Sequence, residues 1–127
     1  MKRTNNFTLV EIIAVLLIIA IMAAVAAPKF ISLSDDAKRG IAQAGVNEAK
    51  ASLSVAYHKA YLAAGGVNTG ITGQSVLTAA GFGDSPATVA FGDASVLMTA
   101  DGTTITLVGS HGSVSTTGSN TWTVPVQ

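Results

Sequence analysis

The sequence predicts an α+β protein in which one long N-terminal helix, transmembrane in its first half and amphipathic in its second half, packs on a small antiparallel β-sheet head. Three observations lead to this prediction. Residues 7–27 are almost entirely apolar, residues 28–64 place small and apolar side chains at helical spacing, and residues 88–127 are rich in β-formers separated by turn residues. Helical and strand patterns in separate parts of one chain are typical of α+β proteins.

The composition limits the classes of function. A length of 127 residues leaves room for one compact head. Seven basic and seven acidic residues cancel, and only 11% of the residues are charged, so there is no broad positive field to hold nucleic acid. The chain has no cysteine and therefore forms neither disulfides nor a thiolate metal site. We expect no nucleic-acid partner and no cofactor.

The apolar segment Phe7 to Ala27 reads FTLVEIIAVLLIIAIMAAVAA, 21 residues with a single charge. At about 1.5 Å per residue a helix of this length spans roughly 30 Å, the thickness of a bilayer's hydrocarbon core. Lys2 and Arg3 precede it without a nearby acid, so residues 1–6 form a basic leader in the cytoplasm and the head lies across the membrane. The alternative is a secretory signal peptide with a cleavage site within AAVAA, but the helical pattern continues beyond Ala27.

Glu11 is the one charged residue within the apolar segment. A carboxylate at membrane depth costs about 2 to 3 kcal/mol unless it has a partner, which makes such a residue a candidate for function. The other interpretation places Glu11 in the first helical turn near the headgroups, where the helix dipole favours a negative charge by about 0.3 to 1 kcal/mol. The residues alone leave both interpretations open.

Residues 7–30, FTLVEIIAVLLIIAIMAAVAAPKF, resemble the N-terminal signature of type IV pilins and pseudopilins, and the stretch KFISLSDDAKR is most similar to mannose-sensitive haemagglutinin pilins. The resemblance implies a type IV pilin-like fold and a leader that a prepilin peptidase removes between Asn6 and Phe7. It also implies N-methylation of Phe7 and pairing of Glu11 with the N-terminal amine of a neighbouring subunit. Pro28 corresponds to the family's helix-bending proline.

This resemblance implies a structural subunit of a type IV pilus-like filament, anchored in the inner membrane before assembly and then exposed on the cell surface. Its partners would be further copies of itself, the prepilin peptidase and the pilus assembly machinery, and its role surface attachment or motility. Two alternatives stay open. One is a major pseudopilin of a type II secretion system, and the other is an uncleaved single-pass membrane protein with an exported binding head, because Asn6 stands where the family has glycine.

The second half of the helix carries signals for a bend, a buried face and an end. Pro28 predicts a kink or a local unwinding near residues 22–25. Gly40 and Gly45 are expected to weaken the helix by roughly 1 kcal/mol each relative to alanine. Gly65-Gly66 predicts its C-terminal cap. The residues expected to pack on the head recur at spacings of three and four: Ala49, Leu53, Ala56, Ala60 and Ala63.

The head begins with a predicted surface loop over residues 65–87, with a short helix around residues 75–80. Asp101-Gly102 predicts a hairpin turn, and residues 110–120 are expected to form a weak strand or a loop. Trp122 and Phe91 are expected in the core of the sheet. The predicted strands are residues 88–91, 95–99, 103–108 and 121–126.

No catalytic site is expected. His58 lies on the helix and His111 in a Gly/Ser-rich stretch, without a carboxylate or serine at a spacing that indicates a triad. The chain is therefore predicted not to be an enzyme. Asp84, Asp93 and Asp101 are read either as turn residues or as oxygen ligands of a calcium site.

Overall fold

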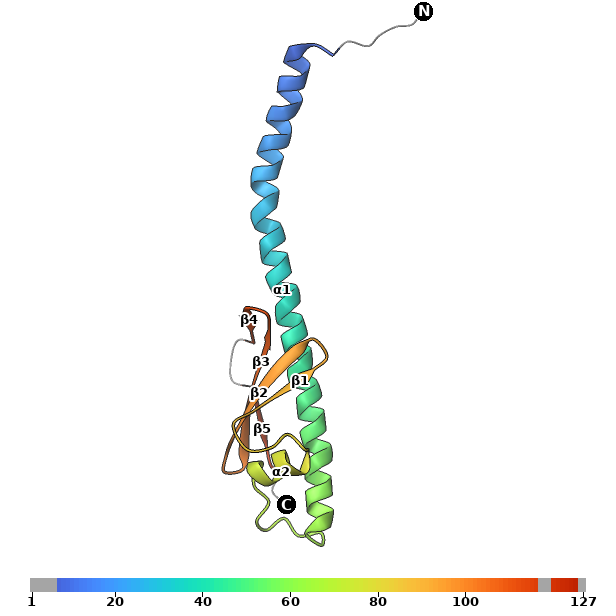
Figure 1. Ribbon diagram of the computed structural model, residues 1–127, viewed down its shortest axis with the longest axis vertical. Helices are drawn as coiled ribbons and strands as arrows, with labels where there is room; N and C mark the ends of the chain where they lie inside the picture. Colours follow the sequence, from blue (N-terminus) through green and yellow to red (C-terminus); the bar gives the residue numbers. More distant parts are fainter. Residues whose placement is uncertain (1–6, 117–119, 126–127) are drawn as a thin grey trace, which may run out of the picture. The chain divides into compact units, whose positions relative to one another are not determined.

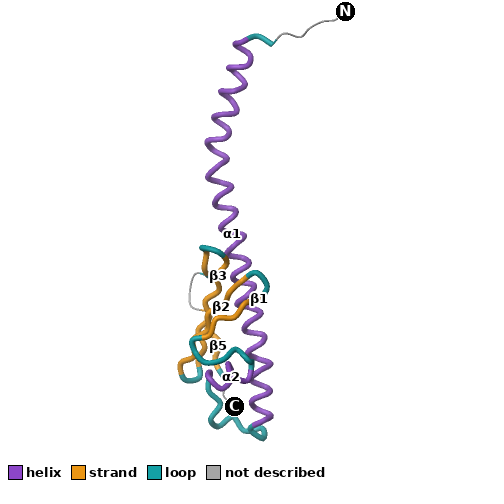
Figure 2. The backbone as a smooth tube through the Cα atoms, in the orientation of Figure 1, coloured by secondary structure: helices purple, strands orange, loops and turns teal. Residues whose placement is uncertain are grey.

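The computed structural model describes residues 7–116 and 120–125, and it confirms an α+β chain with a long N-terminal helix and a small antiparallel sheet (Figures 1 and 2). The chain divides into two compact units, one ending at Asp36 and one formed by Ala37–Gln127. The helices are α1 (Leu9–Ala63) and α2 (Gly73–Ala79), and the strands are β1 (Ala87–Phe91), β2 (Ala94–Asp101), β3 (Thr104–His111), β4 (Val114–Ser115) and β5 (Asn120–Thr123).

Helix α1 continues through Pro28 without interruption, so the interpretation with a local unwinding near residues 22–25 is not seen, and the kink stays a prediction. The helix ends at Ala63, close to the predicted Gly65-Gly66 cap. Gly65 and Gly66 have φ of 73° and 78°, and the N–H of Gly66 donates to the carbonyl of Tyr61 at 3.0 Å. A left-handed glycine followed by this bond is the Schellman arrangement, which satisfies carbonyls at a helix end.

Helix α2 begins with a capping box. The Thr72 hydroxyl accepts a hydrogen bond from the N–H of Ser75, and the Ser75 hydroxyl accepts one from the N–H of Thr72. This pair satisfies two N–H groups that a helix start otherwise leaves open. The N–H of Gly73 also donates to the carbonyl of Gly102 at 2.8 Å. The predicted short helix is therefore present, two residues earlier than expected, and it is tied to the turn between β2 and β3.

The sheet is antiparallel throughout, in the order β1-β2-β3 with β4 and β5 both on the far edge of β3. Strand β5 pairs with residues 104–107 of β3, whereas the short strand β4 pairs with Ser110 and His111. The four predicted strands are thus found with shifted ends, and part of the ambiguous stretch 110–120 is the end of β3 followed by β4.

Three two-residue turns connect β1 through β4, and each starts with a glycine of positive φ: Gly92 and Gly102 at 58°, and Gly112 at 61°. Glycine at the first central position is typical of a type II′ turn, whose twist matches the flanking strands. The turn predicted at Asp101-Gly102 exists, but its central residues are Gly102 and Thr103, because Asp101 still pairs with Thr104.

The core lies between the second half of α1, helix α2 and one face of the sheet (Figure 1). Of the predicted stripe, Ala49, Leu53 and Ala56 are buried, whereas Ala60 is half-buried and Ala63 is exposed. The buried stripe therefore begins and ends earlier in α1 than predicted, because the sheet faces residues 42–57 of the helix. The buried positions of α1 are Ala42, Gly45, Val46, Ala49, Leu53, Ala56 and Tyr57.

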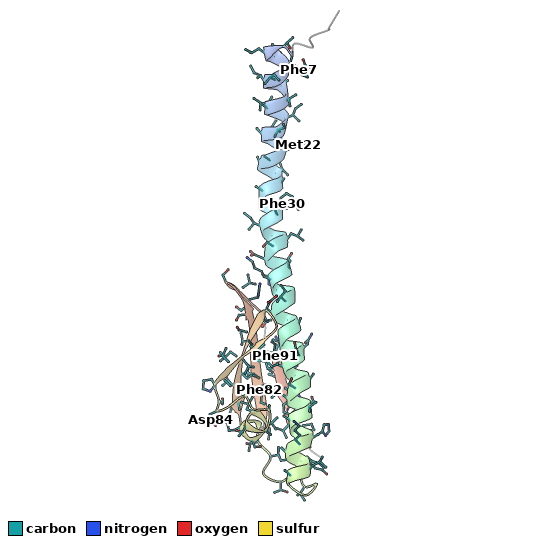
Figure 3. The ribbon with its side chains drawn as sticks, turned by 45° about the vertical axis from the view of Figure 1, so that its right-hand side comes forward. Phe7, Met22, Phe30, Phe82, Asp84 and Phe91 are labelled. Carbon is teal, nitrogen blue, oxygen red and sulfur yellow. The ribbon has the colours of Figure 1, made fainter. Side chains whose placement is uncertain are left out.

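Two aromatic residues predicted in the core are only half-buried at its margin. Phe91 packs edge-to-face on Phe82, with ring centroids 5.7 Å apart (Figure 3). Trp122 lies on β5 at the edge of the sheet, where its indole N–H donates to the Ser54 hydroxyl at 3.2 Å. A half-exposed position allows this polar N–H to find a partner, which a fully apolar core does not provide.

Glycine makes the contact between α1 and the sheet possible. A Cβ on Gly45 of α1 would lie 2.6 Å from the Cβ of Ala94 on β2, and a Cβ on Gly109 of β3 would overlap the carbonyl of Ala42. The helix backbone therefore approaches the sheet more closely than any other residue type allows. Gly45, expected only to weaken the helix, has a packing reason for its place.

Candidate assembly surface

The first unit exposes large apolar side chains from Phe7 to Leu33. Phe7, Met22 and Phe30, labelled in Figure 3, are 67% to 71% exposed, and no residue of the most apolar 18-residue window is buried. The segment is long and apolar enough to cross a membrane by length and composition. The other large exposed residues here are Leu9, Val10, Ile12, Ile13, Val15, Leu16, Leu17, Ile18, Ile19, Ile21, Val25, Ile31 and Leu33.

A helix that is apolar on every face is stable only when something apolar surrounds it. Each large side chain contributes about 1.5 to 3 kcal/mol when it is removed from water, so this surface strongly favours lipid or other apolar helices. The run from Leu9 to Leu33 covers about 36 Å of helix, more than the roughly 30 Å of a hydrocarbon core. The exposed apolar surface therefore extends beyond the predicted segment 7–27 to Phe30, Ile31 and Leu33. The apolar character of these three residues could have indicated this extension from the sequence.

Thr8 caps the start of α1, and sequence reasoning missed this residue. Its hydroxyl accepts a hydrogen bond from the N–H of Glu11 at 3.2 Å, and its carbonyl accepts from the N–H groups of Glu11 and Ile12 at 3.1 and 3.2 Å. A threonine three residues before a glutamate is the sequence signature of a helix start. Thr8 therefore fixes where the helix begins, and with it the position of Glu11.

Glu11 lies in the first turn of α1 and its side chain is exposed. In this position the positive end of the helix dipole favours its negative charge. An exposed carboxylate next to an apolar helix end is also available to a cation from another chain. Phe7 lies one residue ahead of the cap and is 71% exposed, whereas Asn6 and the rest of the leader lie outside the described residues. Cleavage, methylation of Phe7 and the role of Glu11 in assembly stay predictions.

The calcium site considered for Asp84, Asp93 and Asp101 is wrong, because the structure separates these residues. Within residues 7–116 and 120–125, no three acidic or histidine side chains come together at metal-binding distance. Asp93 immediately precedes β2 and Asp101 ends it, so the length of this strand, about 23 Å, separates them. Asp84 accepts a hydrogen bond from the side-chain amide of Gln74 at 3.0 Å.

The two histidines lie apart from each other. His58 is exposed on α1 and contacts the ring of Tyr57 edge-to-face, with centroids 5.5 Å apart. His111, at the end of β3, has its Nδ1 atom 2.6 Å from the carbonyl oxygen of Asp93. Both contacts belong to the packing of the head, and neither brings a nucleophile next to a base.

The structure thus combines a small antiparallel sheet with an exposed apolar helix that by length and composition is suited to a membrane. Residues 1–27 match the family described as "Prokaryotic N-terminal methylation motif". The chain is also 39% identical over 67 residues to the "Type IV narrow pilus major component PilA5" of Thermus thermophilus. That match covers 53% of this chain and 54% of the relative, so the chain spans about half of the length of this curated relative. No solved structure matches.

These two matches, together with the fold, support a type IV pilin. The methylation motif falls on the leader and on the apolar part of α1, where the first unit exposes its apolar surface. The match to a pilus component accords with a structural protein.

Proposed function

We propose that this chain is the structural subunit of a type IV pilus-like filament, held in the inner membrane as a precursor and polymerised on the cell surface through α1. The observation that carries this proposal is the exposed apolar surface from Leu9 to Leu33. In the precursor this surface contacts lipid, and in the filament it contacts the same surface of neighbouring copies. Such an exchange replaces one apolar environment with another and so needs little free energy.

The small residues of α1 support helix-to-helix packing. Alanine at Ala14, Ala20, Ala23, Ala24, Ala26 and Ala27 lets helix backbones approach closely. Removal of residues 1–6 would take away Lys2 and Arg3, the charges that hold this end toward the cytoplasm, and would leave a free amine at Phe7. This amine is the partner we propose for Glu11, because an apolar surrounding makes an unpaired carboxylate costly.

Mass spectrometry of the native N-terminus, combined with electron microscopy of sheared surface material, tests the proposal. We expect a chain that starts at methylated Phe7 and filaments that contain it. The match to a pilus major component supports this outcome. A chain with Met1 intact, present only in the membrane fraction, would overturn the filament and favour the uncleaved anchor, which Asn6 at the predicted cleavage position makes the second candidate. Attachment to a surface or motility is the role we propose for the filament.

A further inference from the structure

The second unit contains an open groove of about 370 Å³ between the outer face of α1 and the end of α2. Its walls are mostly apolar: Ala51 and Val55 come from α1, and Ala80 and Phe82 come from the segment directly after α2. Val55 is 58% exposed, although it is a β-branched apolar residue in the middle of a helix. One acidic residue, Glu48, and one basic residue, Lys59, also line the groove.

Glu48 and Lys59 lie on the same face of α1, but they are too far apart along the helix to form an ion pair with each other within one chain. Eleven residues correspond to about 1,100° of rotation, or three turns and 20°, so the two side chains share a face. They also correspond to about 16 Å of rise, which is more than these two side chains span together. Among the residues that the structure describes, neither charge has an ion-pair partner.

We propose that this groove receives α1 of a neighbouring copy in the same filament, with Glu48 of one copy paired to Lys59 of the next. The inference rests on the proposed function, because copies that bury their N-terminal helices in one polymer lie parallel to each other. A parallel copy displaced by about 16 Å along α1 places its Glu48 beside Lys59 of the first. The apolar side chain of Val55 then lies between the two helices.

At this displacement residues 37–48 of the second copy lie opposite residues 48–59 of the first, so the small exposed residues Gly40 and Ala44 face the groove beside Ala51 and Val55. Contact between two different patches of identical subunits is heterologous, and a heterologous contact repeats without closing when it builds a filament. The apolar surface of the first copy continues to Leu62, which is 75% exposed and lies two turns beyond Val55 on the same face. The contact would add a head-to-head interaction to the packing of the N-terminal helices.

Zero-length crosslinking of native filaments tests the contact directly. A carbodiimide joins a carboxylate to an amine only when the two groups touch, so sheared wild-type filaments should yield a Glu48–Lys59 isopeptide, together with a ladder of multimers on a denaturing gel. The matched control is K59R, which keeps the positive charge but has no amine to react, and should assemble without the link. Filaments that crosslink elsewhere in their heads without this pair, or the same link in detergent-dispersed single chains, would overturn the proposal.

Charge reversal provides the second test. E48K sets two lysines against each other and K59E sets two glutamates, so each variant should give about fivefold less sheared filament than the wild type, whereas the double variant E48K/K59E should restore it. Circular dichroism of each variant in detergent controls for folding. Equal yields for both single variants, or no recovery in the double variant, contradict the contact. Absence of filaments in the wild type overturns the proposed function as well, so the two failures are distinguishable.

Discussion

Gly40 and Gly45 lie five residues apart in α1 and differ in what lies opposite them. An added Cβ at Gly40 meets nothing within 4 Å, whereas at Gly45 it would lie 2.6 Å from the Cβ of Ala94. Alanine raises helix propensity by about 1 kcal/mol at either position, but crowding a packed contact costs about 1 to 3 kcal/mol. We therefore expect G40A to raise the free energy of unfolding and G45A to lower it, measured by urea unfolding of the full chain in detergent. Equal stabilisation by both would show that α1 does not approach β2 closely.

At Glu11 a single substitution can remove the charge of the side chain while its size stays nearly the same. E11Q keeps the shape and the cap from Thr8 but removes the charge, so it should leave membrane insertion unchanged. If the carboxylate pairs with a neighbouring amine, the loss of a charge-assisted bond in an apolar surrounding should reduce sheared filaments by at least about tenfold. Immunoblots of the membrane and filament fractions measure both effects. A filament yield equal to that of the wild type would assign Glu11 to the helix dipole alone.

The sequence shows why Glu11 was found and Thr8 was missed. A single charge within 21 apolar residues is visible in composition, because the membrane makes it costly. A threonine at the start of the same segment is unremarkable unless its spacing to Glu11 is examined as a capping signal. The three aspartates considered for calcium failed for a different reason, since their distances depend on strand directions that spacing along the chain does not give.

At the scale of elements, the turns that start at Gly92, Gly102 and Gly112 set the pairing of consecutive strands from β1 to β4. Each glycine has a φ near 60°, where a side chain costs about 1 to 2 kcal/mol. G102A should therefore lower the free energy of unfolding by about 1 to 2 kcal/mol, whereas T103A at the next, exposed position should change it by less than about 0.5 kcal/mol. Thermal unfolding of both variants measures the difference. A neutral G102A would mean that the turn has another conformation.

The order of elements was predictable from the sequence because each has a local signal. The second half of α1 ends where Gly65-Gly66 predicts, and Asp101-Gly102 marks the β2–β3 hairpin. The turns at Gly92 and Gly112 were not recognised, although they repeat the same glycine at intervals of ten residues. The exact face of α1 that packs on the sheet was not predicted either. It depends on Gly45 and Gly109, where the backbones of α1 and the sheet approach each other closely, and the sequence does not show this approach.

At the scale of the whole molecule, a chain without cysteine closes its head by packing and hydrogen bonds. The carbonyl of Pro125 accepts hydrogen bonds from the Tyr57 hydroxyl at 3.3 Å and from the side-chain amide of Asn68. Val124 beside it is 2% exposed, and its N–H donates to the carbonyl of Thr103. These contacts join α1, the loop after it and the β2–β3 turn to residues 124 and 125. In many small exported proteins a disulfide provides this kind of link.

The second unit contains every residue of the buried core, and the largest exposed apolar stretch lies in the first. Deletion of residues 1–36 should therefore give a folded, monomeric head that is soluble without detergent, because only scattered apolar residues remain exposed. Gel filtration and the fluorescence of the single tryptophan, Trp122, measure its size and its cooperative unfolding. The full chain under the same conditions should require detergent or form polymers. A full-length chain that stays monomeric in plain buffer would show that its N-terminal helix needs neither lipid nor copies of itself, and the proposed filament subunit would have to be abandoned.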